Sequence, residues 1–182
     1  MNRGLISLVL IATTVLSACG QSSTDDSADF NDADVMFAQM MIPHHEQAIE
    51  MAEIALDPST GASAAIQDLA IRIRDAQDPE ITLMKNFLTA WGAPVTPEDG
   101  VDHNSMMEGM LSVEELDELA GLQGSAFDAR WAAAMIAHHK GAVAMAEDVL
   151  SDGKNAETRK LAEEIIANQQ AEIDELTPLS IP

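Results

Sequence analysis

Two stretches of the chain carry adjacent histidines in nearly the same setting. They are "MMIPHHEQAIEMAE" at residues 40–53 and "AMIAHHKGAVAMAE" at residues 134–147, and they contain four of the five histidines in the sequence. A neutral imidazole binds zinc, copper, iron and nickel, whereas a methionine thioether favours Cu(I). Histidine pairs that lie among methionines therefore indicate a metal site, with copper as the first candidate.

The methionines also gather near the histidines. The sequence has 11 methionines in all. Those in the three clusters are Met36, Met40, Met41 and Met51 around the first pair, Met135 and Met145 around the second, and Met106, Met107 and Met110 after His103. A single methionine is an ordinary core residue, so the clustering is what indicates a metal ion. The stretch at 103–110 is interpreted either as a second, weaker site or as a flexible cover.

The residues around the histidines have the composition and periodicity of helices. Aromatic residues make up only 3% of the chain, and Ala, Leu, Ile, Met and Glu are abundant, which favours helix over strand. Apolar residues three and four apart predict main helices near 33–56, 62–91, 126–150 and 155–176, and a short helix near 112–120. Pro79 is expected to kink the second of these helices, and Ser125 to cap the third.

The two halves of this helical region repeat each other. The histidine pair at 44–45 matches the pair at 138–139 at an offset of 94 residues, and Glu80 matches Glu172 at an offset of 92, after a shorter loop. Two helical hairpins with short turns predict an all-α, antiparallel four-helix bundle with internal symmetry, and the long connection at 92–124 holds the short helix.

The helical period places both histidine pairs on, or at the border of, the inward-facing stripe of their helices. The second and fourth helices each carry one carboxylate on their apolar line, Glu80 and Glu172. A buried carboxylate without a partner is costly, and the histidines are the nearest candidates by symmetry. We therefore expect the glutamates to face the histidines.

This layer has two interpretations. In one, the glutamates bond to the imidazoles and only fix the register of the helices. In the other, His44, His45, His138 and His139, helped by Met41 and Met135, bind copper, and the glutamates act as ligands or orient the imidazole rings. Binding is then expected to fail in acid, as imidazoles with a pKa of about 6.5 become protonated.

Signatures of other chemistry are absent from the sequence. It contains no CxxC or HExxH zinc motif and no Glu-x-x-His motif of di-iron bundles. Nothing marks a nucleophile, a substrate pocket or an organic cofactor, which weighs against an enzyme. A metal-dependent oxidoreductase and a metal-free envelope interaction module remain as alternatives to a protein that binds or sequesters copper.

The N-terminal residues predict export and a lipid anchor. Residues 1–18 have the short positive start and apolar run of a signal peptide, and "LSAC" at 16–19 resembles a bacterial lipobox. Cleavage before Cys19, the only cysteine, and its acylation would tether the chain in the cell envelope, as in a periplasmic lipoprotein. The acidic stretch at 19–32 reads as a flexible tether to a domain at 33–177.

The net charge limits the classes of partner that the chain is expected to bind. A formal charge of −22 disfavours nucleic acid and anionic membrane surfaces as partners. The predicted partners are therefore a metal ion and, through the lipid anchor alone, a membrane.

Several segments resemble the domain-of-unknown-function 305 family over about residues 33–177. They are "MMIPHHEQAIEMAE", "MMEGMLSVEEL", "AFDARWAAAMIAHHKGAVAMAE" and two Q-x-x-E-I stretches at 77–81 and 169–173. The resemblance implies an exported, often lipid-anchored protein with a ferritin-like four-helix fold, and, as in the CopM-like members, copper binding through Met and His. It implies as ligands Met40, Met41, His44, His45, Met51, Met135, His138, His139 and Met145.

The repeat is imperfect beside the histidines. Ala134 stands where the first half has Met40, and Lys140 stands where it has Glu46. The two half-sites are therefore expected to be unequal.

Overall fold

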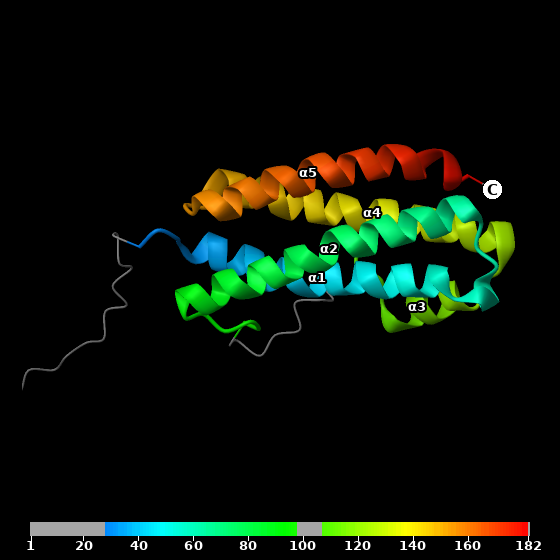
Figure 1. Cartoon of the computed structure of the whole chain (residues 1–182), viewed down its shortest axis with the longest axis horizontal. Helices are drawn as coiled ribbons and strands as arrows, with labels where there is room; N and C mark the ends of the chain where they lie inside the picture. Colours follow the sequence, from blue (N-terminus) through cyan, green and yellow to red (C-terminus); the bar gives the residue numbers. More distant parts are fainter. Residues whose placement is uncertain (1–27, 98–106, 182) are drawn as a thin grey trace, which may run out of the picture.

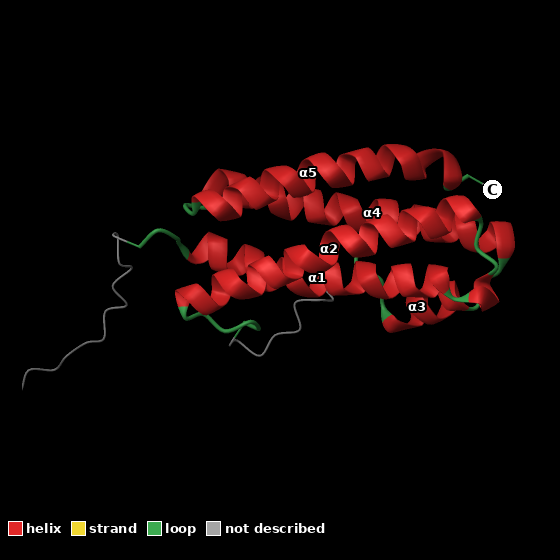
Figure 2. Cartoon of the chain, in the orientation of Figure 1, coloured by secondary structure: helices red, strands yellow, loops and turns green. Residues whose placement is uncertain are grey.

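The chain forms helices and no strands over the residues that the computed structural model describes, 28–97 and 107–181 (Figure 2). The helices are α1 (Asp32–Leu56), α2 (Ala64–Trp91), α3 (Val113–Ala120), α4 (Gly124–Asp152) and α5 (Ala156–Leu176), and 3-10 turns at Pro58–Thr60 and Thr177–Leu179 follow α1 and α5. The predicted all-helical class is confirmed. Each helix also begins and ends within about two residues of its predicted range.

Local chemistry explains where the later helices begin. Ser112 and Glu115 form a capping box at the start of α3. The prediction that Ser125 caps α4 is wrong, because the helix already begins at Gly124 after an extended Gln123. Gly124 adopts φ +58°, which turns the chain into the helix one residue ahead of the serine.

Both helices of the first hairpin contain a proline. Pro43 lies inside α1 and Pro79 inside α2, and each helix continues through it. Proline has no amide hydrogen, so the carbonyl one turn earlier loses its helical partner. In α1 this weakened turn lies directly before the first histidine pair. The kink at Pro79 stays a prediction.

The four long helices lie side by side along the long axis of the molecule (Figure 1). α1 packs against α2 and α4, and α4 packs against α5. Asn31, before α1, donates to the Asp152 carbonyl at the end of α4, and Trp131, early in α4, donates to the Met51 carbonyl late in α1. The two central helices are therefore antiparallel.

The apolar core consists of two clusters. Cluster A contains Ala48, Met51, Ala52, Ala55, Ala62, Ile66, Leu69, Ala70, Ile73, Leu111, Leu116, Leu119, Phe127, Trp131, Ala132, Ala134, Met135 and Leu176. Cluster B contains Phe37, Ala38, Met41, Ile42, Ile81, Met84, Phe87, Leu88, Ala142, Ala146, Val149, Leu161, Ala162 and Ile165. Every long helix contributes to both clusters, so each crosses the boundary between them.

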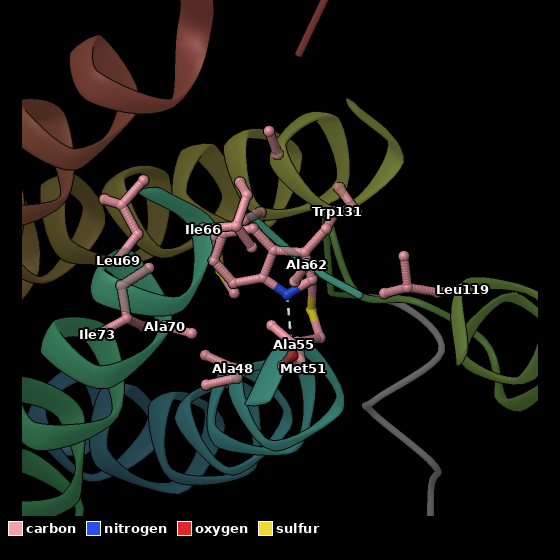
Figure 3. Packing of buried hydrophobic residues seen from close by; sticks show 14 of the residues in the cluster. Ala48, Met51, Ala55, Ala62, Ile66, Leu69, Ala70, Ile73, Leu119 and Trp131 are labelled. Carbon is pink, nitrogen blue, oxygen red and sulfur yellow. Dashed lines mark hydrogen bonds between the residues drawn. The ribbon is translucent and has the colours of Figure 1, made fainter. Parts of the chain in front are cut away.

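Trp131 anchors cluster A (Figure 3). Its indole ring is fully buried, with Ile66 on one side, and its Nε1 donates to the Met51 carbonyl oxygen at 2.8 Å. Burial of a large aromatic ring with its one polar atom bonded stabilises the α1–α4 contact. This contact fixes how the two histidine-bearing helices face each other.

Candidate metal centre

A layer of buried and partly buried polar side chains lies between cluster A and cluster B along the helices. α1 and α4 contribute the two histidine pairs, and all four imidazoles are fully buried. α2 and α5 each contribute a glutamine and a glutamate, one helical turn apart. We call the following eight residues the polar layer: His44, His45, Gln77, Glu80, His138, His139, Gln169 and Glu172. The inward placement predicted for the histidine pairs is observed.

His45 and His139, the outer histidines, each contact a glutamate of the neighbouring helix. Nε2 of His45 lies 2.8 Å from Oε2 of Glu80, and Nε2 of His139 lies 2.8 Å from Oε2 of Glu172. An ionised carboxylate can only accept a hydrogen bond, so we assign the proton to each Nε2, which donates it. The lone pair is then on Nδ1, which in both rings is buried and has no partner among the described residues.

The glutamates therefore select the tautomer of the outer histidines. A carboxylate that accepts from one ring nitrogen orients the ring and raises the basicity of the other nitrogen, as it does behind many metal-bound histidines. Glu80 and Glu172 are themselves only slightly exposed, at 16% and 12% of their side chains. The facing of glutamate and histidine that the repeat predicts is thus present in both halves.

His44 and His138, the inner histidines, face each other between α1 and α4. Their ring centroids are 3.8 Å apart, with 39° between the ring planes. Within the part of the chain that the structure describes, none of their four ring nitrogens has a hydrogen-bond partner. Two helices thus bring imidazole nitrogens close together in an otherwise apolar setting, which is a chemistry suited to a metal ion.

Burial keeps the inner histidines neutral. Loss of hydration lowers the pKa of His44 from 6.5 to about 3, and the charge of His45 acts in the same direction. The Glu108 backbone carbonyl opposes both, since it lies near the ring, although it does not form a well-aligned hydrogen bond with either ring nitrogen. Burial, followed by the nearby His44, lowers the pKa of His138 well below 6.5. In the metal-free protein the inner histidines therefore stay neutral below pH 6.5, and the loss of copper binding in acid stays a prediction.

Sequence reasoning missed two members of the polar layer. Gln77 and Gln169 are each 3% exposed. Both polar atoms of Gln77, and the side-chain oxygen of Gln169, have no hydrogen-bond partner in residues 28–97 and 107–181. The signal was present in the repeated Q-x-x-E spacing, which places each glutamine one turn from its glutamate on the same helix face.

The predicted methionine ligands lie on both sides of the layer. Met41 belongs to cluster B, whereas Met51 and Met135 belong to cluster A, and all three are fully buried. Met40 is half-buried, and Met145 is half-buried against cluster B. Met41 and Met135 each lie one turn before a histidine pair on the same helix, which makes them the thioethers nearest to it along the chain.

Only half of the predicted second site can be placed. Met107 is buried, at 9% exposure, and Met110 is half-buried, in the segment that leads to α3. His103 and Met106 lie outside the described residues, and so do the predicted signal peptide and Cys19.

The two departures from the repeat that the sequence analysis identified lie beside the histidine pairs, at 40/134 and 46/140. Glu46 is exposed and accepts a hydrogen bond from Lys85 at 2.9 Å, and its counterpart Lys140 is exposed as well. Met40 is half-buried where the matching Ala134 is buried. The difference between the halves therefore does not reach the histidines and glutamates themselves.

The described residues contain no preformed metal site made of three histidine, cysteine or carboxylate ligands. No group of three or more histidine, cysteine, aspartate or glutamate side chains among them is placed to hold a metal ion. An ion bound between the inner histidines would thus need a further ligand of another type, and thioether sulfur is the type that lies close by in the sequence.

A model of the family described as domain of unknown function 305 (DUF305) matches residues 34–180. A DUF305 protein of Streptomyces coelicolor, described as secreted, is 29% identical, covers 81% of this chain and 91% of its own, and has a TM-score of 0.74. CopM in its Cu(I)-bound form is 34% identical over 80% of this chain and 93% of its own, with a TM-score of 0.65.

CopM in its Cu(II)-bound form is 33% identical over 81% of this chain and 95% of its own, with a TM-score of 0.67. CopM is also solved with silver bound. No curated protein matches the chain.

Proposed function

The chain belongs to the DUF305 family, and on this premise we propose that it is an exported protein that binds copper in its polar layer. Sequestering the ion there would contribute to metal homeostasis. The observation that carries the proposal is the set of nine buried polar atoms without partners in the described chain, all of which belong to the polar layer. Unpaired buried polar atoms are rare and costly, so a bound ligand is the simplest account of them.

The donor chemistry favours copper over other ions. Neutral imidazoles suit copper and zinc alike, but methionines near the layer favour Cu(I), and acidic ligands that would suit harder ions are occupied with the outer histidines. The copper-bound and silver-bound forms of CopM support the same class of ion. We therefore propose Cu(I) and Cu(II) as the ions bound.

Each part of the layer has a distinct proposed role. The inner histidines His44 and His138 are the primary ligands, because their ring nitrogens have no other partner among the described residues. The outer histidines His45 and His139 offer Nδ1, while Glu80 and Glu172 orient them. The supporting thioethers are those of Met40, Met41, Met51, Met135 and Met145.

We assign the helices to a ferritin-like four-helix bundle of two repeated hairpins, within a domain at 33–177. The matched contacts between His45 and Glu80 and between His139 and Glu172 support the repeat, because they occupy the same place in both hairpins. The repeat in turn explains why a single site draws on two symmetric halves.

The proposal is tested by metal analysis and titration. Protein purified from its native envelope is expected to contain copper, and the metal-free protein to bind Cu(I) and Cu(II) more tightly than Zn(II). Calorimetry and chelator competition at neutral pH measure the three affinities. A protein that carries no copper and gains no thermal stability from it would exclude this function.

We further propose that acylation of Cys19 tethers the domain to a membrane in the cell envelope. None of the helices in the described ranges is long and apolar enough to cross a membrane. The variant C19S is expected to move from the membrane fraction to the soluble fraction, because it has no thiol to acylate. Fractionation followed by immunoblotting measures this, and an unchanged membrane fraction would contradict the anchor.

A further inference from the structure

Residues 107–111, which we call the methionine loop, pack against the turn of α4 that carries an inner histidine. Gly109 in this loop adopts φ +84°, a conformation that residues with a side chain rarely take. A Cβ atom at this position would overlap the Ala137 carbonyl oxygen and would lie 2.8 Å from Cα of His138. The backbone of the methionine loop therefore touches α4 directly at His138.

A second glycine makes room for the same loop from the side of the helix. A Cβ atom on Gly141 would overlap the Glu108 carbonyl oxygen and would lie 3.2 Å from Nε2 of His44. The Glu108 carbonyl thus occupies the space over Gly141, beside the inner histidine of α1. The methionine loop is therefore a third wall around the inner histidines, in addition to α1 and α4.

Gln47 holds the other end of the methionine loop. Its Nε2 donates to the Leu111 carbonyl at 2.8 Å, and its Oε1 accepts from the Leu111 amide at 2.7 Å, both in a buried setting. Two hydrogen bonds to one residue fix the path of the backbone there, and leaving either group unpaired would be costly.

Gln47 and Gly141 are matched residues of the repeat, and both accommodate the methionine loop. They occupy the same position in the two halves, at the offset of 94 residues that also relates the histidine pairs. In one half this position bonds the methionine loop, and in the other it leaves space for it. The two copies have thus diverged at the position where a single loop meets both helices.

We propose that the methionine loop completes the copper site, with Met107 and Met110 binding Cu(I) through sulfur together with the inner histidines. This inference rests on the proposed function. Met107 directly precedes the residue whose carbonyl lies beside His44, and it is 9% exposed. The loop thereby brings two thioether-bearing residues to the wall around the inner histidines, whose ring nitrogens have no hydrogen-bond partner within residues 28–97 and 107–181. Gln47 and Gly141 are positioning residues for this loop.

Removal of the two thioethers tests the ligands directly. The variant M107L/M110L keeps the apolar volume of both side chains but removes sulfur. Its affinity for Cu(I) is expected to fall about tenfold or more, while its affinity for Cu(II), which imidazoles serve well, stays within about threefold of the parent. Competition with a coloured Cu(I) chelator under anaerobic conditions measures the first, and calorimetry the second.

A matched control separates sulfur at the site from sulfur in the core. Met84 is fully buried in cluster B, and the variant M84L is expected to bind both ions as the parent does. X-ray absorption at the copper edge gives an independent readout. Sulfur scatterers are expected in the Cu(I)-loaded parent and in M84L, and fewer of them in M107L/M110L.

Displacing the loop without removing any ligand atom tests the positioning role. In G141A the new methyl group meets the Glu108 carbonyl, so the loop must move, although alanine is normally the better helix former. The expected result is the same selective loss of Cu(I) affinity with unchanged helix content by circular dichroism. The control is G121A, where φ is negative and the nearest atom would lie 3.5 Å from the added Cβ.

The outcomes separate this inference from the function on which it rests. If the parent binds copper but M107L/M110L keeps its Cu(I) affinity within about threefold, the methionine loop is not part of the site and the inference is overturned, while the proposed function stands. If the parent binds neither copper ion, the proposed function fails first. Should G141A not fold, M107L/M110L alone decides.

Discussion

The variant H44L/H138L is expected to be more stable than the metal-free parent and to gain nothing from copper. In the parent, the four ring nitrogens of this pair are buried without partners in the described chain. A buried polar group left unpaired costs roughly 1–3 kcal/mol, whereas an apolar pair of similar volume carries no such cost. A gain of about 2 kcal/mol would raise the melting temperature by about 4–8 °C for a domain of this size.

Copper is expected to reverse this order of stability. At a free copper concentration of about 1,000 times Kd, binding to the folded state alone stabilises the parent by about 4 kcal/mol, which corresponds to roughly 8–16 °C. The variant lacks the primary ligands, so its melting temperature should not change. Scanning calorimetry of both proteins at neutral pH tests this reversal. The variant should have the higher melting temperature without copper, and the parent should have the higher melting temperature with copper.

The alternative role of the histidines predicts the opposite pattern. If the polar layer only fixes the register of the helices, loss of the inner histidines lowers stability and copper changes neither protein. M84L is the control for a buried substitution away from the layer, and it should keep the copper-dependent rise. A variant less stable than the metal-free parent, together with a parent that does not respond to copper, would contradict a metal site.

Stability and function would then be opposed at the inner histidines. Sites that bind ligands often keep polar groups that the fold alone would not tolerate. Among the residues that the structure places, His44 and His138 have no hydrogen-bond partner at either ring nitrogen, whereas the glutamates bond the outer histidines at Nε2. Among the four histidines, only the inner pair has both ring nitrogens unpaired in the described chain, and that pair is where the ion gains most by binding.

The helical period allowed much of the site to be predicted from the sequence. It placed both histidine pairs in the interior, and the repeat located Glu80 and Glu172 opposite them. Both inferences rely on local geometry, since residues three and four apart share a helix face and a duplicated hairpin places matched residues alike. For the same reason the helix ranges could be predicted closely, except for the turn at Gly124.

The remaining features depend on contacts between distant segments. Periodicity assigns a residue to a face but does not say which neighbour reaches it, so adjacent histidines could not be divided into inner and outer ones. The place of the methionine loop depends on Gly109 and Gly141, which meet backbone atoms far away in the sequence. The low pKa of His44 likewise follows from burial by the whole assembly rather than from its neighbours in the chain.

Lowering the pH from 7 to 5 is expected to destabilise the metal-free parent strongly and H44L/H138L only weakly. In the unfolded chain an imidazole gains a proton at a pKa of about 6.5, whereas in the folded protein burial lowers the pKa of His44 to about 3. The unfolded state therefore binds more protons between these values. Stability is fully present above pH 6.5 and is lost as the pH falls toward about 3.

Above pH 5, the loss of unfolding free energy that the inner histidines cause can be measured apart from the titration of the acidic residues. Linkage gives a loss of about 2 kcal/mol from His44 between pH 6.5 and 5, and His138, whose pKa is also lowered, acts in the same direction. Exposed carboxylates titrate mainly below this range, and the outer histidines with Glu80 and Glu172 are common to both proteins. Urea unfolding at pH 7, 6 and 5 measures the difference. Equal losses of unfolding free energy in the two proteins would mean that the inner histidines reach water and protons in the folded state, and the layer would then not be the closed, neutral site that copper binding requires.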